Sequence, residues 1–196
     1  KKSLYLIGLV SSFLLFSSYA RAEVDAEVAY ILNTFSFLVC GFLVMWMAAG
    51  FLFLESGLVT TRSVSTIAAK NIGKFAIVSI VFYLFGYNLG YGVEEGGILG
   101  FPSLWTDNSS MDTGYSDASD WFFQALFVCA TVSIVSGAVA ERIKIWPFFV
   151  FAAILGGFIY PIQMGWEWGG GWLDALGFSD FAGSTLVHAC GGSAAL

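Results

Sequence analysis

The sequence predicts an all-α integral membrane protein, a polytopic bundle of helices. Of its 196 residues, 58% are hydrophobic, 18% are aromatic and only 11% are charged. Roughly a quarter of the residues in a soluble domain are charged, so this composition does not suit a surface that faces water. Apolar runs long enough to span a bilayer recur along the chain, and the charged residues gather in short clusters between them.

Residues 1–22 have the features of a cleavable signal peptide. Lys1 and Lys2 precede a short apolar core, and Ala20-Arg21-Ala22 forms a small-x-small cleavage site. An uncleaved first helix is the alternative interpretation, but the short core and the cleavage site favour removal. Residues 23–196 would then form the membrane domain.

Five apolar segments follow the signal segment. Four of them reach the ~20 residues that a spanning helix needs, and the fifth is still running at the last residue. The predicted helices are residues 31–59, 72–92, 120–139, 145–164 and 179–196. Because a bundle that stops within a helix is an implausible whole protein, we expect the sequence to be the N-terminal part of a longer chain.

The basic residues indicate an orientation. After the signal segment they fall in what we interpret as two connections, and they are Arg62, Lys70, Lys74, Arg142 and Lys144. The positive-inside rule makes these connections cytoplasmic. The other loops carry acidic residues and no basic ones. We therefore expect a multi-pass protein of the cell (inner or plasma) membrane, with the mature N-terminus outside.

The net charge of −6 is distributed over several loops and does not form one acidic face. We therefore expect the lipid bilayer to be the main partner, and no nucleic acid.

His188 is the clearest candidate for a functional residue. It lies about two turns into the fifth segment, where an ionisable side chain must face the bundle interior or a pore. A neutral imidazole both donates and accepts a proton, which suits a relay. A histidine that only completes hydrogen bonds within the bundle is the alternative.

Trp168 follows the fourth segment and precedes three consecutive glycines. An aromatic anchor at the membrane interface is one interpretation. The other is a cation–π platform at the mouth of a pore, since glycines beside the indole would leave its face uncovered.

Three further residues have open interpretations. Phe123, near the outer end of the third helix, suits packing or lipid contact by default. Asp180, at the outer start of the fifth, is either a helix cap or an organiser of an outer vestibule. Glu55, near the inner end of the first, either reaches the interface or hydrogen-bonds within the bundle.

No metal cluster, phosphate loop or Ser-His-Asp arrangement is apparent in the sequence, so we expect no metal, no cofactor and no enzymatic activity.

Four stretches of the sequence, taken together, resemble the ammonium transporter family (Amt/Mep/Rh). They are residues 49–59 (AGFLFLESGLV), 137–143 (GAVAERI), 168–171 (WGGG) and 180–188 (DFAGSTLVH). The last is long and specific, and the order and spacing of all four agree with the family. The resemblance implies the first about five of eleven helices of that fold, whose pore lies between two inverted halves.

The resemblance also implies roles for individual residues. Trp168 would line an outer ammonium site, Phe123 would form the outer ring of a phenylalanine gate, and Asp180 would be the buried acid that holds the site together. His188 would be the first histidine of a twin-His pair. Ammonium, with methylammonium as its analogue, would lose its proton near Phe123, and ammonia would cross an apolar, His-lined pore.

The family forms homotrimers with one pore per subunit, and cytoplasmic PII-type proteins close some members. Thr61-Arg62-Ser63 departs from the family's Gly-Lys-Asn, which bears on such docking. An ammonium sensor that uses the same membrane domain is the alternative function. An unrelated transporter or membrane enzyme of similar hydropathy is disfavoured by the match over residues 180–188.

Overall fold

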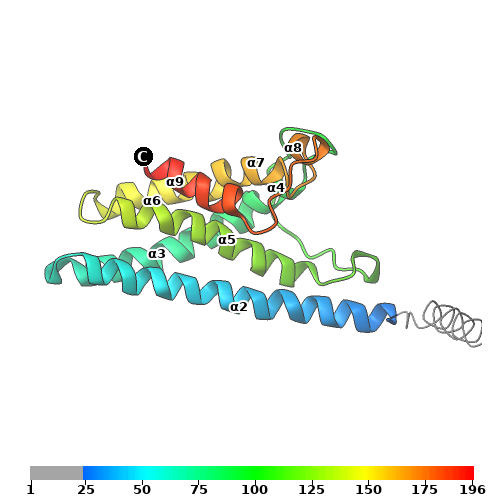
Figure 1. The fold of residues 1–196 in the computed structure, drawn as a ribbon, viewed down its shortest axis with the longest axis horizontal. Helices are drawn as coiled ribbons and strands as arrows, with labels where there is room; N and C mark the ends of the chain where they lie inside the picture. The colour runs from blue at the N-terminus through cyan, green and yellow to red at the C-terminus, as the bar shows by residue number, and fades with distance from the viewer. Residues whose placement is uncertain (1–23) are drawn as a thin grey trace, which may run out of the picture.

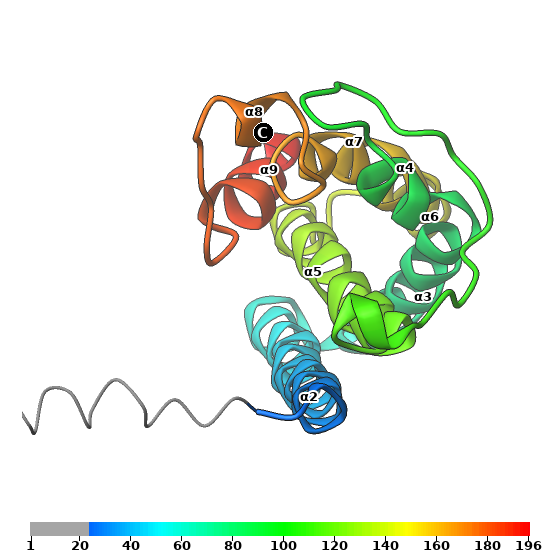
Figure 2. The ribbon, with the colours of Figure 1, turned by 90° about the vertical axis from the view of Figure 1, so that its right-hand side faces the viewer.

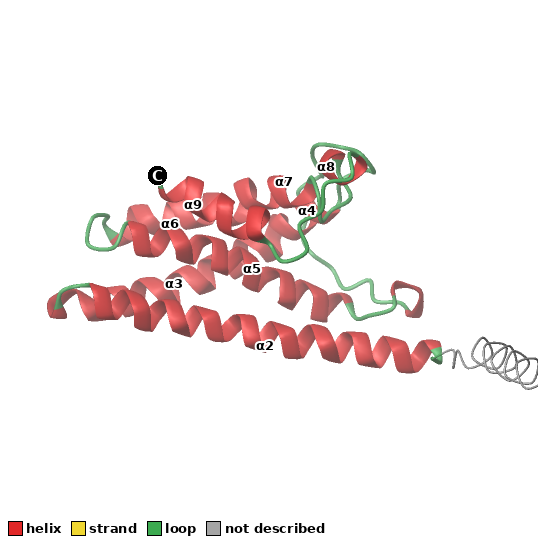
Figure 3. Cartoon of the chain, in the orientation of Figure 1, coloured by secondary structure: helices red, strands yellow, loops and turns green. Residues whose placement is uncertain are grey.

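The structure is a computed structural model that describes residues 24–196, so the predicted signal peptide, residues 1–22, lies outside the described residues. The described residues form helices and loops without any strand (Figure 3). Four helices are long and apolar enough to cross a membrane: Ala26–Leu58, Thr61–Tyr91, Asp117–Ala138 and Ile145–Gly165. The predicted all-α membrane bundle is confirmed.

The first helix, α2 (Ala26–Leu58), starts at Asp25, whose side chain accepts the backbone N–H of Glu27. Within α2 only Gly41 and Glu55 are buried. Its 33 residues give a length of roughly 50 Å at 1.5 Å per residue, more than a bilayer core needs. The prediction began this helix at residue 31 because the acidic start lowers the local hydropathy.

In the second span, the α-helix begins at Val64, eight residues before the predicted start at residue 72. A short turn, η1 (Thr61–Ser63), leads into α3 (Val64–Val81), and a wide π turn, η2 (Phe82–Gly86), leads into α4 (Tyr87–Tyr91). The assignment of Lys70 and Lys74 to a connecting loop is therefore wrong. Both side chains lie inside the bundle, 4% and 1% exposed. Their charges lower the hydropathy here, and only tertiary partners make their burial possible.

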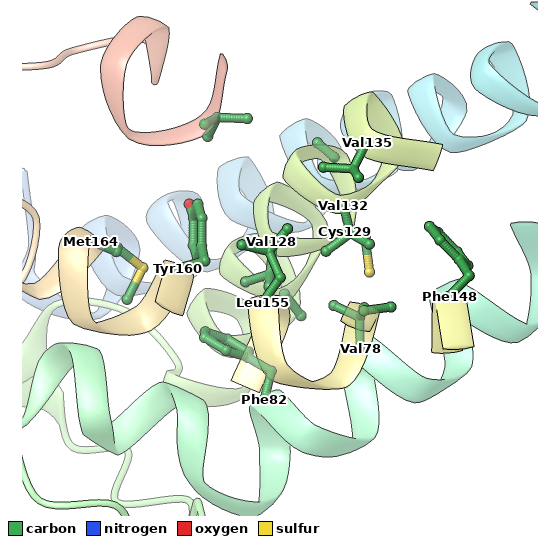
Figure 4. Packing of buried hydrophobic residues seen from close by; sticks show 14 residues of the cluster. Val78, Phe82, Val128, Cys129, Val132, Val135, Phe148, Leu155, Tyr160 and Met164 are labelled. Carbon is green, nitrogen blue, oxygen red and sulfur yellow. The ribbon is translucent and has the colours of Figure 1, made fainter. Parts of the chain in front are cut away.

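The long helix α5 (Asp117–Ala138) lies between its neighbours (Figures 1 and 2) and packs against α2, α3 and α9. The fourth span consists of α6 (Ile145–Ile154), the π turn η4 (Leu155–Ile159) and α7 (Tyr160–Gly165). The buried core joins these elements around Phe82, Val128, Val132, Leu155 and Tyr160 (Figure 4).

The fifth segment is helical only from Ser184, not from the predicted residue 179. A π turn, η5 (Ser184–Ala189), continues into α9 (Cys190–Ala195). Gly183 has a φ of +78°, a conformation that glycine adopts without steric cost. This turn ends the preceding loop and delays the start of the helix.

The loops gather at two ends of the bundle (Figure 1). We call the end with loops 92–116 and 166–183 the aromatic end; it carries η3 (Met111–Thr113) and α8 (Trp172–Ala175). We call the end with loops 59–63 and 139–144 the basic end, since Arg62, Arg142 and Lys144 lie there. The two ends hold different buried polar groups.

Candidate functional site

A cavity of about 540 Å³ lies at the aromatic end, and most of its lining side chains are aromatic. None of its lining residues is basic, and its polar groups are dominated by oxygen atoms. Such a lining favours a cation, through aromatic faces and carboxylate charge. The lining residues are Phe37, Tyr87, Tyr91, Tyr115, Asp120, Phe123, Gln124, Phe127, Trp168, Phe181 and Ala182.

The indole of Trp168 is held from two sides of this cavity. Its Nε1–H donates to the carbonyl oxygen of Asp180 at 2.8 Å. Its ring meets the ring of Phe127 edge to face, with the centroids 5.7 Å apart. It also lies against the backbone of Gly183, where an added Cβ would sit 3.3 Å from the indole. The ring is fixed in orientation while it lines the cavity.

The glycines after Trp168 lie where a side chain would meet neighbouring backbone or require a positive φ. Gly170 has a φ of +75°, and a side chain at Gly169 would overlap the carbonyl oxygen of Gly90. A Cβ at Gly171 would lie 2.6 Å from the carbonyl oxygen of Gly165. The run therefore lets the loop fold closely onto α4 and α7, and the shape of that loop positions Trp168.

Asp180 caps η5 with its carboxylate and holds Trp168 with its backbone carbonyl. Its Oδ1 accepts the backbone N–H groups of Gly183 and Ser184 at 2.8 and 2.9 Å. Its Oδ2 accepts those of Thr185 and Leu186 at 2.7 and 2.8 Å. The carboxylate thus caps η5, while its carbonyl holds Trp168. Burial raises the pKa of Asp180, but the four N–H donors outweigh burial and hold the pKa below its ordinary value.

Glu167 supports Asp180 and was missed by sequence reasoning. Its Oε1 accepts the backbone N–H of Asp180 at 2.9 Å, and its Oε2 is buried without a partner among the described residues. Burial raises the pKa of Glu167, against the lowering effect of that hydrogen bond. In the sequence it was only one of several acidic loop residues.

The phenylalanine in contact with Trp168 is Phe127, one turn deeper than the predicted Phe123. Phe123 lies 4.8 Å from the ring of Phe127 and 5.4 Å from Phe37, measured between centroids. Both phenylalanines line the cavity. The spacing of four residues, which places both on one helix face, was the signal that could have identified Phe127.

His188 does not line this cavity. It lies in η5, where its backbone N–H donates to the carbonyl oxygen of Gly183 at 3.0 Å. Its side chain is exposed, whereas the adjacent Leu186 and Val187 are buried. Asp180, Gly183 and η5 thus connect the cavity to the histidine along one short segment.

Asp120 is a second missed acid, and it lines the cavity directly. It is 5% exposed. The hydroxyl of Tyr87 donates to its Oδ2 at 2.6 Å, and Nε2 of Gln124 donates to its Oδ1 at 3.3 Å. Asp120 lies in the first turn of α5, at the first residue of the predicted third helix, and the sequence pattern did not single it out as a site residue.

Toward the basic end, a network of charged groups is buried away from this cavity. Glu55 is 2% exposed. Of its two predicted positions, the burial excludes a side chain that reaches the membrane interface and leaves one that hydrogen-bonds within the bundle. Its Oε2 lies 3.2 Å from Nζ of Lys70 and accepts the hydroxyl of Ser136 at 2.9 Å. Lys70 also donates to the carbonyl oxygen of Ser136 at 2.8 Å, and it lies 5.1 Å from the ring centroid of Phe148.

Lys74 extends this network between α3 and α5. Its Nζ donates to Ser133 Oγ at 2.6 Å and to Asn71 Oδ1 at 2.8 Å. These contacts connect α2, α3 and α5 through two ammonium groups and one carboxylate. Each ammonium group has two polar partners, as buried charges require, and Oε1 of Glu55 is buried without a hydrogen-bond partner among the described residues.

Comparisons with known proteins agree with the fold and with the sequence motifs. A putative ammonium transporter of Synechocystis sp., sll1017, is 41% identical over 199 residues, covering 98% of this chain and 45% of its own length. The ammonium transporter Amt2 of Archaeoglobus fulgidus is 40% identical over 169 residues, covering 81% of this chain and 36% of its own length. The chain thus spans less than half of these relatives.

Solved structures give the same result. A sensor Amt protein superposes with a TM-score of 0.78 at 29% identity, over 86% of this chain and 43% of that one. Mep2 of Candida albicans superposes with a TM-score of 0.73 at 26% identity, over 88% of this chain and 40% of that one. The sequence model of the Ammonium Transporter Family matches residues 35–196, and this chain belongs to that family.

Proposed function

We propose that the protein to which this chain belongs is a transmembrane channel for ammonium or ammonia. The observation that supports this function best is the cavity in which Trp168, Phe123 and Phe127 present aromatic surfaces beside oxygen acceptors and without a basic residue. Ammonium is a small cation that donates hydrogen bonds, so it matches this lining. The relatives named above are described as ammonium transporters.

The aromatic end would face outward in this function. Arg62, Arg142 and Lys144 lie in the loops of the basic end, and the positive-inside rule assigns that end to the cytoplasm even without the two buried lysines. The helix α2 runs from the aromatic end to the basic end, so its start lies at the opposite end of the bundle from loop 59–63 (Figure 1). The mature N-terminus would then lie outside.

Transport would begin with the cation against Trp168. An apolar passage does not replace the hydration shell of an ion, so ammonium would release its proton near the phenylalanines, and neutral ammonia would enter. The proton either stays outside or follows a separate relay. The contact between Phe127 and Trp168 makes Phe127, with Phe123 above it, the first constriction that we propose.

His188 would line the next part of the passage. An exposed imidazole on a membrane segment needs polar or protein surroundings, and segments outside this chain would supply the facing wall of a pore.

We also propose a homotrimer, tested by the mass of the detergent-purified protein. Docking of a cytoplasmic PII-type regulator would take place at the basic end and is tested by co-purification.

Uptake of methylammonium by the full-length protein, in cells that lack their own ammonium transporters, tests this function. Trp168→Leu should weaken apparent affinity by about tenfold, because a cation–π contact in a desolvated site is worth ~1–2 kcal/mol. His188→Ala should reduce uptake without a comparable change in affinity. Wild-type uptake in both variants, at equal amounts of membrane protein, would contradict the assigned roles.

A sensor is the second candidate function, because a sensor Amt protein is among the similar solved structures. A sensor would carry a signalling domain after the membrane domain. The coding sequence beyond residue 196 distinguishes the two: a signalling domain there, with no measurable methylammonium uptake, would favour the sensor.

A further inference from the structure

We propose that the carboxylate of Asp120 binds the ammonium cation in the cavity at the aromatic end, as an anionic partner to the aromatic face of Trp168. This inference rests on the proposed function and adds to it a charged ligand that is distinct from Asp180. Both Asp120 and Trp168 line the same cavity of about 540 Å³. Asp180 is not among the lining residues, because its carboxylate is directed at the backbone of η5.

The charge of Asp120 is not neutralised within residues 24–196. The ion pair of that part of the chain is Glu55–Lys70, in the separate network toward the basic end. The two donors to Asp120, the Tyr87 hydroxyl and the Gln124 amide, are both neutral. A carboxylate has about four lone-pair positions, and two single donors leave capacity for a ligand. A buried, uncompensated charge is costly, so a bound cation would relieve that cost.

The surroundings of Asp120 favour a cation that donates hydrogen bonds. The Oε1 atom of Gln124 is buried and has no hydrogen-bond partner among the described residues, although this side chain also lines the cavity. A buried acceptor without a donor is an unusual feature of a protein and calls for an explanation. An ammonium ion could donate to this oxygen and to Asp120 while the rings of Trp168 and Phe123 cover its other sides.

Tyr87 holds the carboxylate in place from α4, across the bundle from α5. Its hydroxyl donates at 2.6 Å to Oδ2, and its ring lies 4.9 Å from that of Tyr91, which also lines the cavity. The hydrogen bond orients Asp120 but does not supply a positive charge.

The test uses the full-length protein and methylammonium as the probe, with uptake kinetics in cells and isothermal titration calorimetry on the purified protein. Asp120→Asn should raise the half-saturating concentration and the dissociation constant about tenfold or more, since a nearby charge in a partly desolvated site contributes strongly. Maximal uptake should change much less. Higher ionic strength should weaken binding to the wild type more than binding to the variant.

Asp117→Asn is the matched control. Asp117 lies one turn earlier in the same helix, accepts the backbone N–H of Asn108 at 3.1 Å and does not line the cavity. The substitution removes one negative charge, as Asp120→Asn does. The half-saturating concentration and the dissociation constant should nevertheless stay within about twofold of the wild type. Equal effects of the two variants, or an unchanged affinity in Asp120→Asn, would overturn the proposal.

Asp120→Ser decides the matter if Asp120→Asn fails to fold. It keeps a side-chain oxygen for the Tyr87 hydroxyl and removes the charge, so the dissociation constant for methylammonium should rise about tenfold or more. Wild-type affinity in a folded Asp120→Ser protein would overturn the proposal.

The two assays distinguish this proposal from the proposed function. If the wild-type protein binds methylammonium in a way that requires Asp120 but shows no uptake, the conduction proposal fails and the proposed site stands. If the wild-type protein shows uptake that Asp120→Asn does not change, conduction stands and the proposed site fails. A wild-type protein that neither transports nor binds methylammonium contradicts both.

Discussion

The two ends of the bundle bury acidic side chains in opposite ways. At the aromatic end, Asp120, Glu167 and Asp180 are buried with neutral donors as partners: a tyrosine hydroxyl, an amide and backbone N–H groups. Toward the basic end, Glu55 is buried against the ammonium group of Lys70, with Lys74 nearby. Negative charge is in excess in the first region and positive charge in the second.

This difference separates a site whose carboxylates face only neutral donors from one whose carboxylate faces an ammonium group. The cavity at the aromatic end retains uncompensated negative charge and free acceptors, as a cation site requires. In the network around Glu55, each ammonium group already has at least two partners. We therefore assign this network to the stability of the contact among α2, α3 and α5, and the following changes test that assignment.

The largest effect is expected from Glu55→Gln. Neutral glutamine leaves the buried Lys70 and Lys74 without an anion, and breaking a buried ion pair from one side costs about 3–5 kcal/mol. The full-length protein should melt at a clearly lower temperature in detergent, or fail to accumulate. Adding Lys70→Met should recover part of the loss, because it removes one uncompensated cation.

Glu27→Gln is the control for this change, since Glu27 is exposed in the first turn of the same helix. The melting temperature of Glu27→Gln should equal that of the wild type. A melting temperature of Glu55→Gln that matches the control would show that the network contributes little. A second loss on adding Lys70→Met would contradict the charge-balance explanation.

A smaller effect is expected from Asp180→Asn. One amide oxygen replaces the two that accept four backbone N–H groups, which should cost roughly 2 kcal/mol. The folded-state pKa of Asp180 is lowered. Its stabilisation is therefore complete above the unfolded-state pKa and is lost as the pH falls through the lower folded-state pKa.

Melting curves recorded from about pH 7 to pH 3 test the role of Asp180 at the aromatic end. The difference between the wild type and Asp180→Asn should be largest near neutrality and should shrink toward the acid end. A difference independent of pH would mean that shape, and not the ionised carboxylate, holds η5.

The smallest effect is expected from Glu141→Gln at the exposed surface of the basic end. Glu141 has a φ of +61°, and its Oε1 accepts both the backbone N–H and the hydroxyl of Thr60. Hydrogen bonds from the Thr60 side chain, Ser63 and the Thr60 backbone lower the pKa of Glu141. Because water competes for these groups, the melting temperature should shift by less than about 2 °C. A shift as large as that of Glu55→Gln would remove the distinction between buried and exposed acids at this end.

The features that could be predicted from the sequence are those that depend on a single property of a residue type, such as its hydropathy, or on a short local motif. Long apolar runs predicted the spans, and the stretch from Asp180 to His188 predicted the family, which the comparisons confirm. The prediction for Lys70 and Lys74 was wrong because a lysine lowers the hydropathy of its segment, and low hydropathy was interpreted as a loop. Their burial depends on Glu55, Ser133 and Ser136, which are distant in sequence.

The candidate site shows the same limit. Trp168 and Phe123 were predicted, and both line the cavity. Phe127 lies one turn further along the same helix and also lines it, but nothing in a sequence with twenty phenylalanines singled it out. Asp120 and Glu167 looked like ordinary loop acids, and only their packing makes them buried.

The sequence alone determined that this chain lies in a membrane, how many apolar segments it has and to which family its motifs point, because these depend on composition and on short local patterns. The tertiary structure decided which charges are compensated. It brings Tyr87 to Asp120, Glu167 to the backbone of Asp180, and two lysines to Glu55. The energy of a buried charge depends on its neighbours in space, and those neighbours come from different helices.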